Sequence, residues 1–354
     1  MGFKKRILIA PLNWGLGHAT RCIPIINELI AHHFEPIIAS DGKALLLLKK
    51  EFPNLTTIEL PSYHIKYPKN GSLFRIKLLF RSLKILKAVY KEQKKTDTII
   101  ASYRIDGIIS DNRLGVFSKV IPSVYITHQL HVLSGFTTFL SSKLHHFFIK
   151  KFDQCWIPDN NEKLSLSGKL GHLNYPKFNL KYIGVLSRFK EIQTSNKYNL
   201  FVMLSGPEPQ RSIFEKLLLN KLKDYKGKVL FVKGKIENEQ KTTIKNNITI
   251  VNFMQSDALQ LAINQSDLIL CRSGYTSVMD LVKLGKKAFF IPTPGQFEQE
   301  YLAKRLEQLN FAPMCKQSHF NLKQLNRISN YKGLSFFNKN TVDFKLLFRL
   351  FDSK

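Results

Sequence analysis

The sequence predicts an α/β protein built from two Rossmann-like domains whose parallel sheets face a central cleft. The chain has 354 residues, which is too long for one typical core and suits two domains. Short apolar runs of strand length alternate with amphipathic stretches of helical period. This alternation stops in a polar segment before residue 198 and then restarts, so each half is expected to form its own sheet of βαβ units.

The first half opens with the apolar run RILIAPL at 6–12, which is expected to be a buried strand. Residues 19–33 place isoleucine and leucine at helical spacing and predict the first helix. The same reasoning predicts the other elements of this half: strands at 35–40, 56–60, 107–111 and 123–128, and helices at 43–52 and 73–95. Strands and helices that alternate in this way indicate a doubly wound parallel sheet.

The second half repeats the pattern. It predicts strands at 198–206, 228–234, 248–253, 267–271 and 287–292, and helices at 212–222, 257–265, 275–285 and 298–309. The polar segment between the halves has no clean period, which is typical of a linker. The expected divisions are 1–186 for the first domain, 187–198 for the linker, 199–330 for the second domain, and 331–354 for a tail with an amphipathic helix at 343–351.

The chain is strongly basic, with 54 Lys and Arg against 26 Asp and Glu and a formal net charge of +28. Such a charge favours an anionic partner, which is a nucleic acid, an anionic membrane surface or a phosphorylated substrate. Four cysteines lie far apart without metal-ligand spacing, as free thiols in a reducing compartment do. No stretch approaches the ~18–20 apolar residues of a membrane span, and the N-terminus does not resemble a signal peptide, so a cytoplasmic protein is expected.

The first loop with chemistry is NWGLGHAT, between the first strand and the first helix. Gly15 and Gly17 allow a tight turn and close approach to the backbone, and His18 follows at once. The loop lacks the third glycine of a dinucleotide fingerprint and the GK[ST] of a P-loop. His18 is either a catalytic group at this turn or an ordinary loop histidine, and the loop alone does not choose between them.

Two loops of the second half are suited to a phosphorylated ligand. Ser205 and Gly206, after the first strand, offer a hydroxyl and an N–H group, although a plain strand-to-helix connection explains them as well. In CRSGYTSVMD, free N–H groups at a helix start and the hydroxyls of Ser273 and Ser277 form an anion site. Asp280, one turn later, can accept hydrogen bonds from ribose hydroxyls. The alternative for this loop is helix capping beside one solvated aspartate.

A fourth loop, PTPGQFEQEYLA, brings carboxylates and an amide together at 298–300. Glu298, Gln299 and Glu300 are expected to face the same crevice edge. Sugar hydroxyls both donate and accept hydrogen bonds, so such a row suits a sugar. The alternative is an acidic helix start that complements the helix dipole.

These loops, in this order, resemble those of the GT-B glycosyltransferases of family 28. The resemblance extends from NWGLGH to GQFEQEYLA and is strongest over 267–303, while Asp280 stands where the family has a glutamate and Glu300 where it has a second glutamine. It implies that Arg188 lies near the base, Met254 faces the uracil with its backbone, and Tyr275 lines the diphosphate and sugar. With the loop residues above, the expected donor-binding set is Arg188, Ser205, Gly206, Met254, Ser273, Gly274, Tyr275, Ser277, Asp280, Glu298, Gln299 and Glu300.

On the acceptor side, the resemblance places Gly15, Gly17 and His18 at the end of the family's glycine-rich loop. The run YITHQL stands where the family has His-Glu-Gln-Asn, so His128 and Gln129 are expected on this side, and only Gln129 matches. The departure predicts a different acceptor. The family implies transfer of a hexose or N-acetylhexosamine from a UDP-sugar to a hydroxyl, with inversion at the anomeric carbon.

The expected chemistry uses His18 as the general base, since its unperturbed pKa lies near neutrality. Asp111 is the candidate carboxylate that orients it. Helix N-termini can stabilise the leaving diphosphate without an obligatory metal, and no DxD-like metal motif lies in a suitable loop. The expectation is therefore a nucleotide-sugar-dependent enzyme with no cofactor and no metal site.

Residues 73–95 carry eight Lys or Arg and one Glu beside an apolar stripe. This pattern predicts either a helix that lies on anionic lipid or a packed helix with a solvated lysine face. The first would place the enzyme on the inner face of the membrane and suit a lipid-linked acceptor. Two other functions remain as alternatives: a UDP-sugar 2-epimerase, and a nucleic-acid binder, for which no recognition motif is found.

Overall fold

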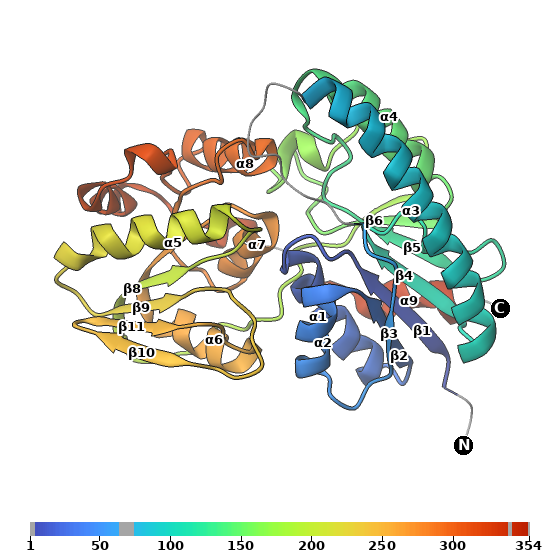
Figure 1. The fold of residues 1–354 in the computed structure, drawn as a ribbon, viewed down its shortest axis with the longest axis horizontal. Coiled ribbons are helices and arrows are strands. Elements are labelled where there is room, and N and C mark those ends of the chain that lie inside the picture. The colour runs from blue at the N-terminus through green and yellow to red at the C-terminus, as the bar shows by residue number, and fades with distance from the viewer. Residues whose placement is uncertain (1–3, 64–73, 339–341, 353–354) are drawn as a thin grey trace.

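The computed structural model describes residues 4–63, 74–338 and 342–352. The N-terminal domain holds a seven-stranded parallel sheet in the order β3-β2-β1-β4-β5-β6-β7 (Figure 1). Its strands are β1 (Arg6–Pro11), β2 (Glu35–Ser40), β3 (Thr57–Glu59), β4 (Gly107–Asp111), β5 (Ser123–Ile126), β6 (Gln154–Ile157) and β7 (Leu180–Tyr182). The chain reverses its direction of travel across the sheet between β1 and β4, and ligands of open parallel sheets bind at such a switch point.

The helices of this domain are α1 (Gly17–Ala31), α2 (Gly42–Glu51), α3 (Phe74–Tyr103) and α4 (Thr138–Ile149), with short 3₁₀ turns at Gly135–Thr137 and Gly168–Leu170. Helix α1 begins two residues earlier than the spacing predicts, and α3 continues eight residues beyond 95. The sequence analysis places no element over α4, β6 and β7. The two strands have only four and three residues, too few for a period to be recognised.

The C-terminal domain holds a six-stranded sheet in the order β10-β11-β9-β8-β12-β13. Its strands are β8 (Tyr198–Met203), β9 (Val229–Val232), β10 (Thr242–Lys245), β11 (Ile248–Val251), β12 (Ser266–Cys271) and β13 (Ala288–Phe290). Only β10 runs antiparallel, paired with β11 through a two-residue turn in which Asn246 has a positive φ. The two-domain α/β fold class is confirmed, but β10 is missed because all four of its side chains are exposed and show no alternation.

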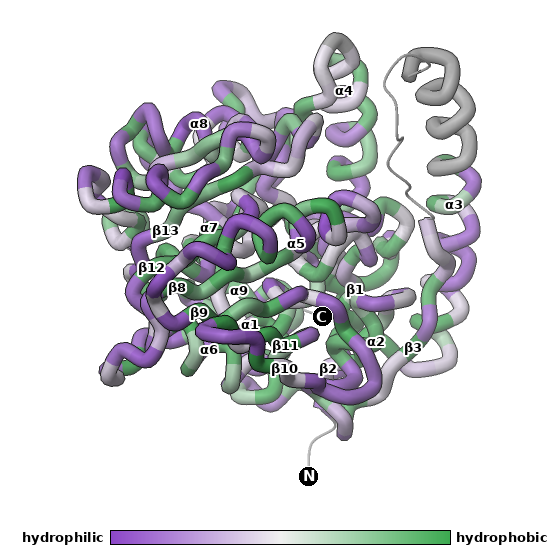
Figure 2. Tube along the Cα trace, turned by 60° about the vertical axis from the view of Figure 1, so that its left-hand side comes forward, coloured by the Kyte–Doolittle hydropathy of each residue, from purple (hydrophilic) through white to green (hydrophobic). Residues whose placement is uncertain are grey.

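Four α-helices of the second domain lie within two residues of their predicted positions: α5 (Gln210–Lys221), α6 (Ser256–Asn264), α7 (Tyr275–Lys283) and α8 (Phe297–Gln308). Short 3₁₀ segments follow at Leu222–Asp224, Gln317–His319, Leu322–Asn330 and Ser335–Phe337. Figure 2 shows hydrophobic stretches along the interior strands and hydrophilic ones over the outer turns.

The last helix, α9 (Phe344–Asp352), lies on the N-terminal domain although it follows the second domain in sequence (Figure 1). Phe348 is buried, with its ring centroid 5.7 Å from that of Phe34. Lys5 Nζ donates to the carbonyl of Phe351 at 2.6 Å. The last described helix therefore lies on the same domain as the first described strand.

The two domains meet through the loops at the carboxyl ends of their strands and through facing helices. Helix α1 packs on α7, where Thr276 Oγ1 donates to the carbonyl of Gly17 at 3.1 Å. At another point, Glu51 of α2 accepts from the N–H and hydroxyl of Ser256 at 3.1 and 2.8 Å. A ligand bound at these loops would contact both domains, so the interface is the expected place for a binding site. In the described part of the chain, no helix is both long and apolar enough to cross a bilayer.

Candidate active site

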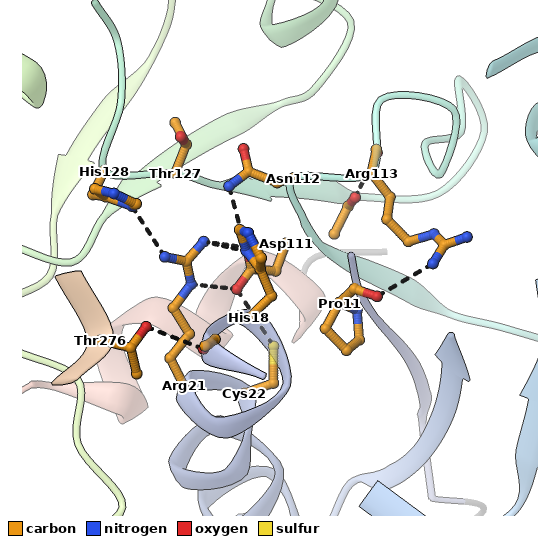
Figure 3. A network of polar contacts seen from close by, with 12 residues as sticks. Pro11, His18, Arg21, Cys22, Asp111, Asn112, Arg113, Thr127, His128 and Thr276 are labelled. Atoms are coloured by element: carbon orange, nitrogen blue, oxygen red, sulfur yellow. Dashed lines mark hydrogen bonds and ion pairs between the residues drawn. The ribbon is translucent and has the colours of Figure 1, made fainter. Parts of the chain in front are cut away.

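A buried group of polar side chains lies where β1 and β4 end side by side. Pro11 and Asp111 are paired in the register of these strands, so the loop after β1 and the end of β4 are adjacent. His18, in the first turn of α1, has Nδ1 2.8 Å from Asp111 Oδ1 (Figure 3). Arg21, one turn further on α1, donates to both carboxylate oxygens of Asp111. The side chains of Arg21 and Asp111 are fully buried, so their charges compensate each other inside the protein.

The charges of this group favour a neutral imidazole beside an ionised carboxylate. Burial alone raises the pKa of Asp111, but Arg21 and His18 outweigh it and bring the pKa to about 2. Burial lowers the pKa of His18, Asp111 opposes this, and Arg21 adds to it. Nδ1 of His18 lies 2.8 Å both from Asp111 Oδ1, which only accepts, and from Arg21 Nη2, which only donates, so these contacts are compatible with either tautomer of the neutral ring. In the tautomer with the proton on Nδ1, that N–H donates to Asp111 and Nε2 holds a lone pair, which no hydrogen bond from the described residues reaches.

The glycines of the NWGLGH loop have different structural roles. Gly15 has a φ of +74°, and a side chain placed there would meet open space. At Gly17 a β-carbon would come within 3.0 Å of Thr276 Oγ1, so this glycine allows α1 and α7 to approach. Asn13 ties the loop to α2 by donating to Asp41 Oδ2 at 3.0 Å. Gly17 thus serves the contact between domains, which the sequence analysis did not anticipate.

Two expected acceptor-side residues contact an expected donor-side residue. His128 Nε2 lies 2.9 Å from Glu298 Oε1, and the Gln129 amide donates to Glu298 Oε2. The ring of His128 stacks on Tyr275 at a centroid distance of 4.2 Å, and the Tyr275 hydroxyl donates to the carbonyl of Pro158 at 2.8 Å. The Tyr275 side chain therefore points into the N-terminal domain, whereas its backbone stays at the start of α7.

The backbone at the ends of β8 and β12 leaves space beside two glycines. Gly206 has a φ of +102°, and no heavy atom of the described residues lies within 4 Å of an ideal β-carbon at this position, so a ligand can come close to it. Gly274 is the N-cap of α7, and the nearest atom to its ideal β-carbon is Gln299 Nε2 at 3.9 Å. The helix start, Gly274 and the Gln299 amide thus share one place, where N–H donors and the helix dipole favour negative charge.

Several predicted donor-site side chains form hydrogen bonds with the backbone of neighbouring loops. Ser273 Oγ donates to the carbonyl of Gln299 at 2.8 Å, and Gln299 Oε1 accepts from Thr293 N at 2.8 Å. Glu300 is exposed and accepts from Gly295 N at 2.9 Å. These contacts fix the loop after β13 against the start of α7. They leave the Nε2 group of Gln299, and not Glu300, facing the α7 N-terminus.

Arg188 and Asp280 form a second buried pair of charged side chains. The guanidinium is buried, and among the described residues its Nε and Nη1 have no hydrogen-bond partner; Nη1 lies 3.7 Å from Glu51 Oε1. Asp280 accepts from the Ser187 hydroxyl at 2.6 Å. Burial raises the pKa of Asp280 to about 6, although Arg188 and Ser187 oppose this. Donors without partners at a domain interface are able to hold a polar ligand.

The other predicted residues lie near these groups without joining them. Met254 is partly buried after β11 and packs on the core, Ser277 is half-buried one turn into α7, and Ser205 is half-buried before Gly206. The residue that the sequence analysis missed is Arg21. Its position three residues after His18 puts both side chains on one helix face, which is the signal that was available.

Residues 209–330 match the model of the glycosyltransferase family 28 C-terminal domain. The chain is 24% identical over 334 residues to an uncharacterized glycosyltransferase of Methanosarcina acetivorans, covering 88% of this chain and 86% of that one. It is 22% identical over 253 residues to the UDP-N-acetylglucosamine–N-acetylmuramyl-(pentapeptide) pyrophosphoryl-undecaprenol N-acetylglucosamine transferase of Haemophilus ducreyi, covering 68% of this chain and 67% of that one.

Solved structures share the fold over nearly the whole chain. The glycotransferase of kitacinnamycin aligns with a TM-score of 0.63 and 12% identity over 99% of this chain and all of that one. A UDP-glucosyltransferase of Polygonum tinctorium aligns with a TM-score of 0.61 and 13% identity over all of both chains. MurG of Acinetobacter baumannii aligns with a TM-score of 0.51 and 16% identity over 92% of this chain and 90% of that one. Such neighbours bear out the two-domain arrangement of the GT-B fold.

Proposed function

We propose that this chain, a GT-B glycosyltransferase with a family 28 C-terminal domain, transfers a hexose or N-acetylhexosamine from a UDP-sugar to an acceptor hydroxyl with inversion. The observation that carries the proposal is the buried His18–Asp111 pair, which faces the start of α7 and the loop before α8 across the domain interface. The neutral imidazole and the N–H groups of α7 are the two parts that such a transfer needs.

In this proposal the donor would lie along the second domain. Its diphosphate would lie at Gly206 and the N-terminus of α7, where backbone N–H groups and the helix dipole stabilise the negative charge that grows on the leaving group. Its nucleoside would lie at Arg188 and Asp280, whose buried polar groups then gain partners. In this proposal the dipole and the backbone N–H groups of α7 supply the stabilisation, and no metal is required.

The chemical step is a single displacement. Nε2 of His18 takes the proton of the acceptor hydroxyl while the acceptor oxygen forms a bond to the anomeric carbon. The bond from that carbon to the diphosphate oxygen breaks on the opposite face, and its electron pair leaves with the diphosphate. Attack opposite the leaving group inverts the anomeric carbon. The imidazolium that forms is stabilised by Asp111 through Nδ1–H.

The acceptor would lie at a membrane surface. Helix α4 exposes Phe139, Leu140 and Phe147 by 71%, 68% and 58%, and Lys143 lies over the Phe139 ring at 4.4 Å. Helix α3 lies on the same side of the N-terminal domain (Figure 1). Exposed aromatic side chains beside lysines suit an anionic lipid surface.

The described half of α3 supports the same surface. The apolar stripe predicted from the sequence consists of Ile76, Leu79, Phe80, Leu83, Leu86 and Tyr90. In the structure Leu86 and Tyr90 are exposed, and the buried face of the helix is formed by Val89, Glu92, Thr96 and Ile99. The helix therefore packs on the domain through one face, and the exposed Leu86 and Tyr90 on its other face support contact with lipid. The side chains of 73–85 lie outside the part of the chain that the structure describes, so the rest of the stripe stays a prediction.

The test is turnover with a panel of nucleotide sugars. We expect one UDP-sugar to raise the melting temperature, because a ligand that binds only the folded state stabilises it by mass action. With that donor and a lipid extract, UDP should be released and the sugar should appear on lipid. An epimerase would release an altered nucleotide sugar with no acceptor, and the matched relatives, which are glycosyltransferases, do not favour it. Tight nucleic-acid binding without turnover would overturn the proposal.

A further inference from the structure

The polar group around His18 continues across the domain interface. Arg21 Nη1 donates to His128 Nδ1 at 3.0 Å, and His128 Nε2 is 2.9 Å from Glu298 Oε1. The first two residues belong to the N-terminal domain and Glu298 belongs to α8 of the second domain (Figure 3 shows the N-terminal part). A continuous chain of contacts therefore joins the proposed base to a carboxylate of the donor domain.

The hydrogen bonds of this chain determine the proton positions on His128. A guanidinium can only donate, so Nδ1 of His128 must accept from Arg21 and carries no proton. The proton of the neutral imidazole is then on Nε2, which donates to Glu298. Stacking on Tyr275 and the second hydrogen bond from Gln129 hold Glu298 and the His128 ring in this geometry.

The charged and titratable groups that face His18 come from four places: Arg21 and Cys22 on α1, Asp111 with Asn112 at the end of β4, His128 after β5, and Glu298 on α8. Burial raises the pKa of Cys22 well above its usual value, so this thiol is neutral. Burial also raises the pKa of Glu298, but His128, His18 and Arg21 outweigh it, so this carboxylate is ionised. Arg21 cancels Asp111, and the remaining charge is the negative charge of Glu298.

This charge balance matters at the moment of proton transfer. Without Glu298, protonation of His18 would leave one uncompensated positive charge in a buried site. With Glu298 in place, the imidazolium is formed in a group whose charges then sum to zero. Because Glu298 is on the second domain, this compensation exists only while the two domains are in contact.

We infer that Glu298 is a positioning residue that completes the charge of the base across the interface, so that His18 takes the acceptor proton efficiently only when the donor domain is closed on the acceptor domain. The inference rests on the proposed function. Asp111 alone is the weaker partner for the imidazolium because Arg21 already neutralises it. Closure of the two domains over the donor therefore also brings Glu298 to the group that contains the proposed base.

The test is the pH profile of kcat for Glu298→Gln, which keeps the shape of the side chain and removes its charge. A negative charge favours the imidazolium and raises the pKa of His18, so its removal lowers that pKa. We expect the acidic limb of the profile to move down by about 1 pH unit. The plateau should fall about 3- to 10-fold, because a weaker base takes the proton less readily. Glu298→Asp keeps the negative charge, so the acidic limb of its pH profile should return to the wild-type position.

Glu307→Gln is the matched control, since it changes a carboxylate on the same helix that pairs with Arg327 at 2.7 Å, away from the base. Its acidic limb should stay at the wild-type pH. If Glu298→Gln raises only the KM for the donor and leaves the limb in place, Glu298 merely holds the sugar and the inference is wrong.

A second measurement separates this inference from the proposed function. In protein labelled at the histidine rings, NMR titration with UDP present reports the pKa of His18 without turnover. A lower pKa in Glu298→Gln supports the inference even if no sugar is transferred, and an unchanged pKa overturns it. Absence of turnover with every nucleotide sugar in the wild type would count against the proposed function alone.

Discussion

At the scale of single residues, the site depends on a few buried charges that are matched in pairs. Asp111 is fully buried and yet ionised because Arg21 meets both of its oxygens. The same arginine lowers the pKa of His18 and fixes the tautomer of His128. One helix turn thus carries both the proposed base and an arginine that affects its charge state.

Replacement of His18 by alanine removes the proposed base. We expect kcat to fall by about 100-fold or more, which is typical of the loss of a general base. Donor binding should persist because the donor loops belong to the second domain. The increase in melting temperature on addition of the donor measures this binding. Activity near the wild-type value with intact donor binding would show that His18 is not the base.

Asp280 predicts a pH dependence of stability in the absence of ligand. Its pKa is raised from 3.8 to about 6 in the folded protein, so folding favours the protonated carboxyl. The favourable contribution is complete below pH 3.8 and is lost as the pH rises through about 6. Between pH values below 3.8 and pH 8, the contribution of this group to the free energy of unfolding falls by about 3 kcal/mol.

The measurement is urea unfolding of the wild type and Asp280→Asn from about pH 4 to about pH 8, which spans the change. The wild type should lose stability over this range, and the variant should lack this part of the change because its amide does not titrate. Equal slopes for both proteins would mean that Asp280 is ionised at little cost in the folded state.

At the scale of elements, the helix starts and the facing helices decide what the site can hold. Helix α7 brings free N–H groups to the interface, and α1 brings His18 and Arg21 to the same place. Gly17 and Thr276 let these helices approach closely. Helix α4, which the sequence analysis did not predict, contributes the exposed aromatic surface.

Replacement of Phe139 and Phe147 on α4 by serine should weaken binding to anionic vesicles by at least about tenfold. The substitutions remove two phenyl rings whose transfer from water into the lipid favours binding. Sedimentation with anionic and neutral vesicles at low and high salt measures this. Tyr175→Ser is the matched control, since Tyr175 is 89% exposed on another loop and should not contribute. Equal binding by all three proteins would exclude α4 from the membrane surface.

At the scale of the whole molecule, the chain crosses between domains twice and so ties them together. Helix α9 returns to the N-terminal domain, where Phe348 packs beside Phe34 and His32. Both tryptophans, Trp14 and Trp156, lie in that domain, so tryptophan fluorescence reports its unfolding.

Phe348→Ala should destabilise the N-terminal domain by about 3 to 5 kcal/mol, the cost of a cavity left by a buried phenyl ring. Urea unfolding followed by tryptophan fluorescence measures this loss. Leu346→Ala on the same helix is the control, because Leu346 is half exposed and should change the stability by less than about 1 kcal/mol. A small effect at Phe348 would mean that α9 does not stabilise this domain.

Much of the fold can be predicted from the sequence, because long amphipathic helices and buried parallel strands leave a clear period. The helices of the second domain lie within two residues of prediction for this reason. The short strands β6 and β7 and the exposed strand β10 have no such signal, since pairing with a neighbour and not their own pattern defines them. The short strands β6 and β7, the exposed edge strand β10 and helix α4 were therefore the elements that the sequence analysis did not predict.

For the candidate site, too, some features can be predicted from the sequence and others depend on the tertiary structure. The sequence by itself determined the two-domain α/β fold, the loops that carry glycine, histidine and carboxylates, and the resemblance to family 28, because these are local patterns along the chain. Only the tertiary structure decided that Arg21 meets Asp111, that Tyr275 points into the N-terminal domain, and that Glu298 meets His128. Those contacts join residues 90 to 170 positions apart, and burial of their charges has meaning only once both domains are packed.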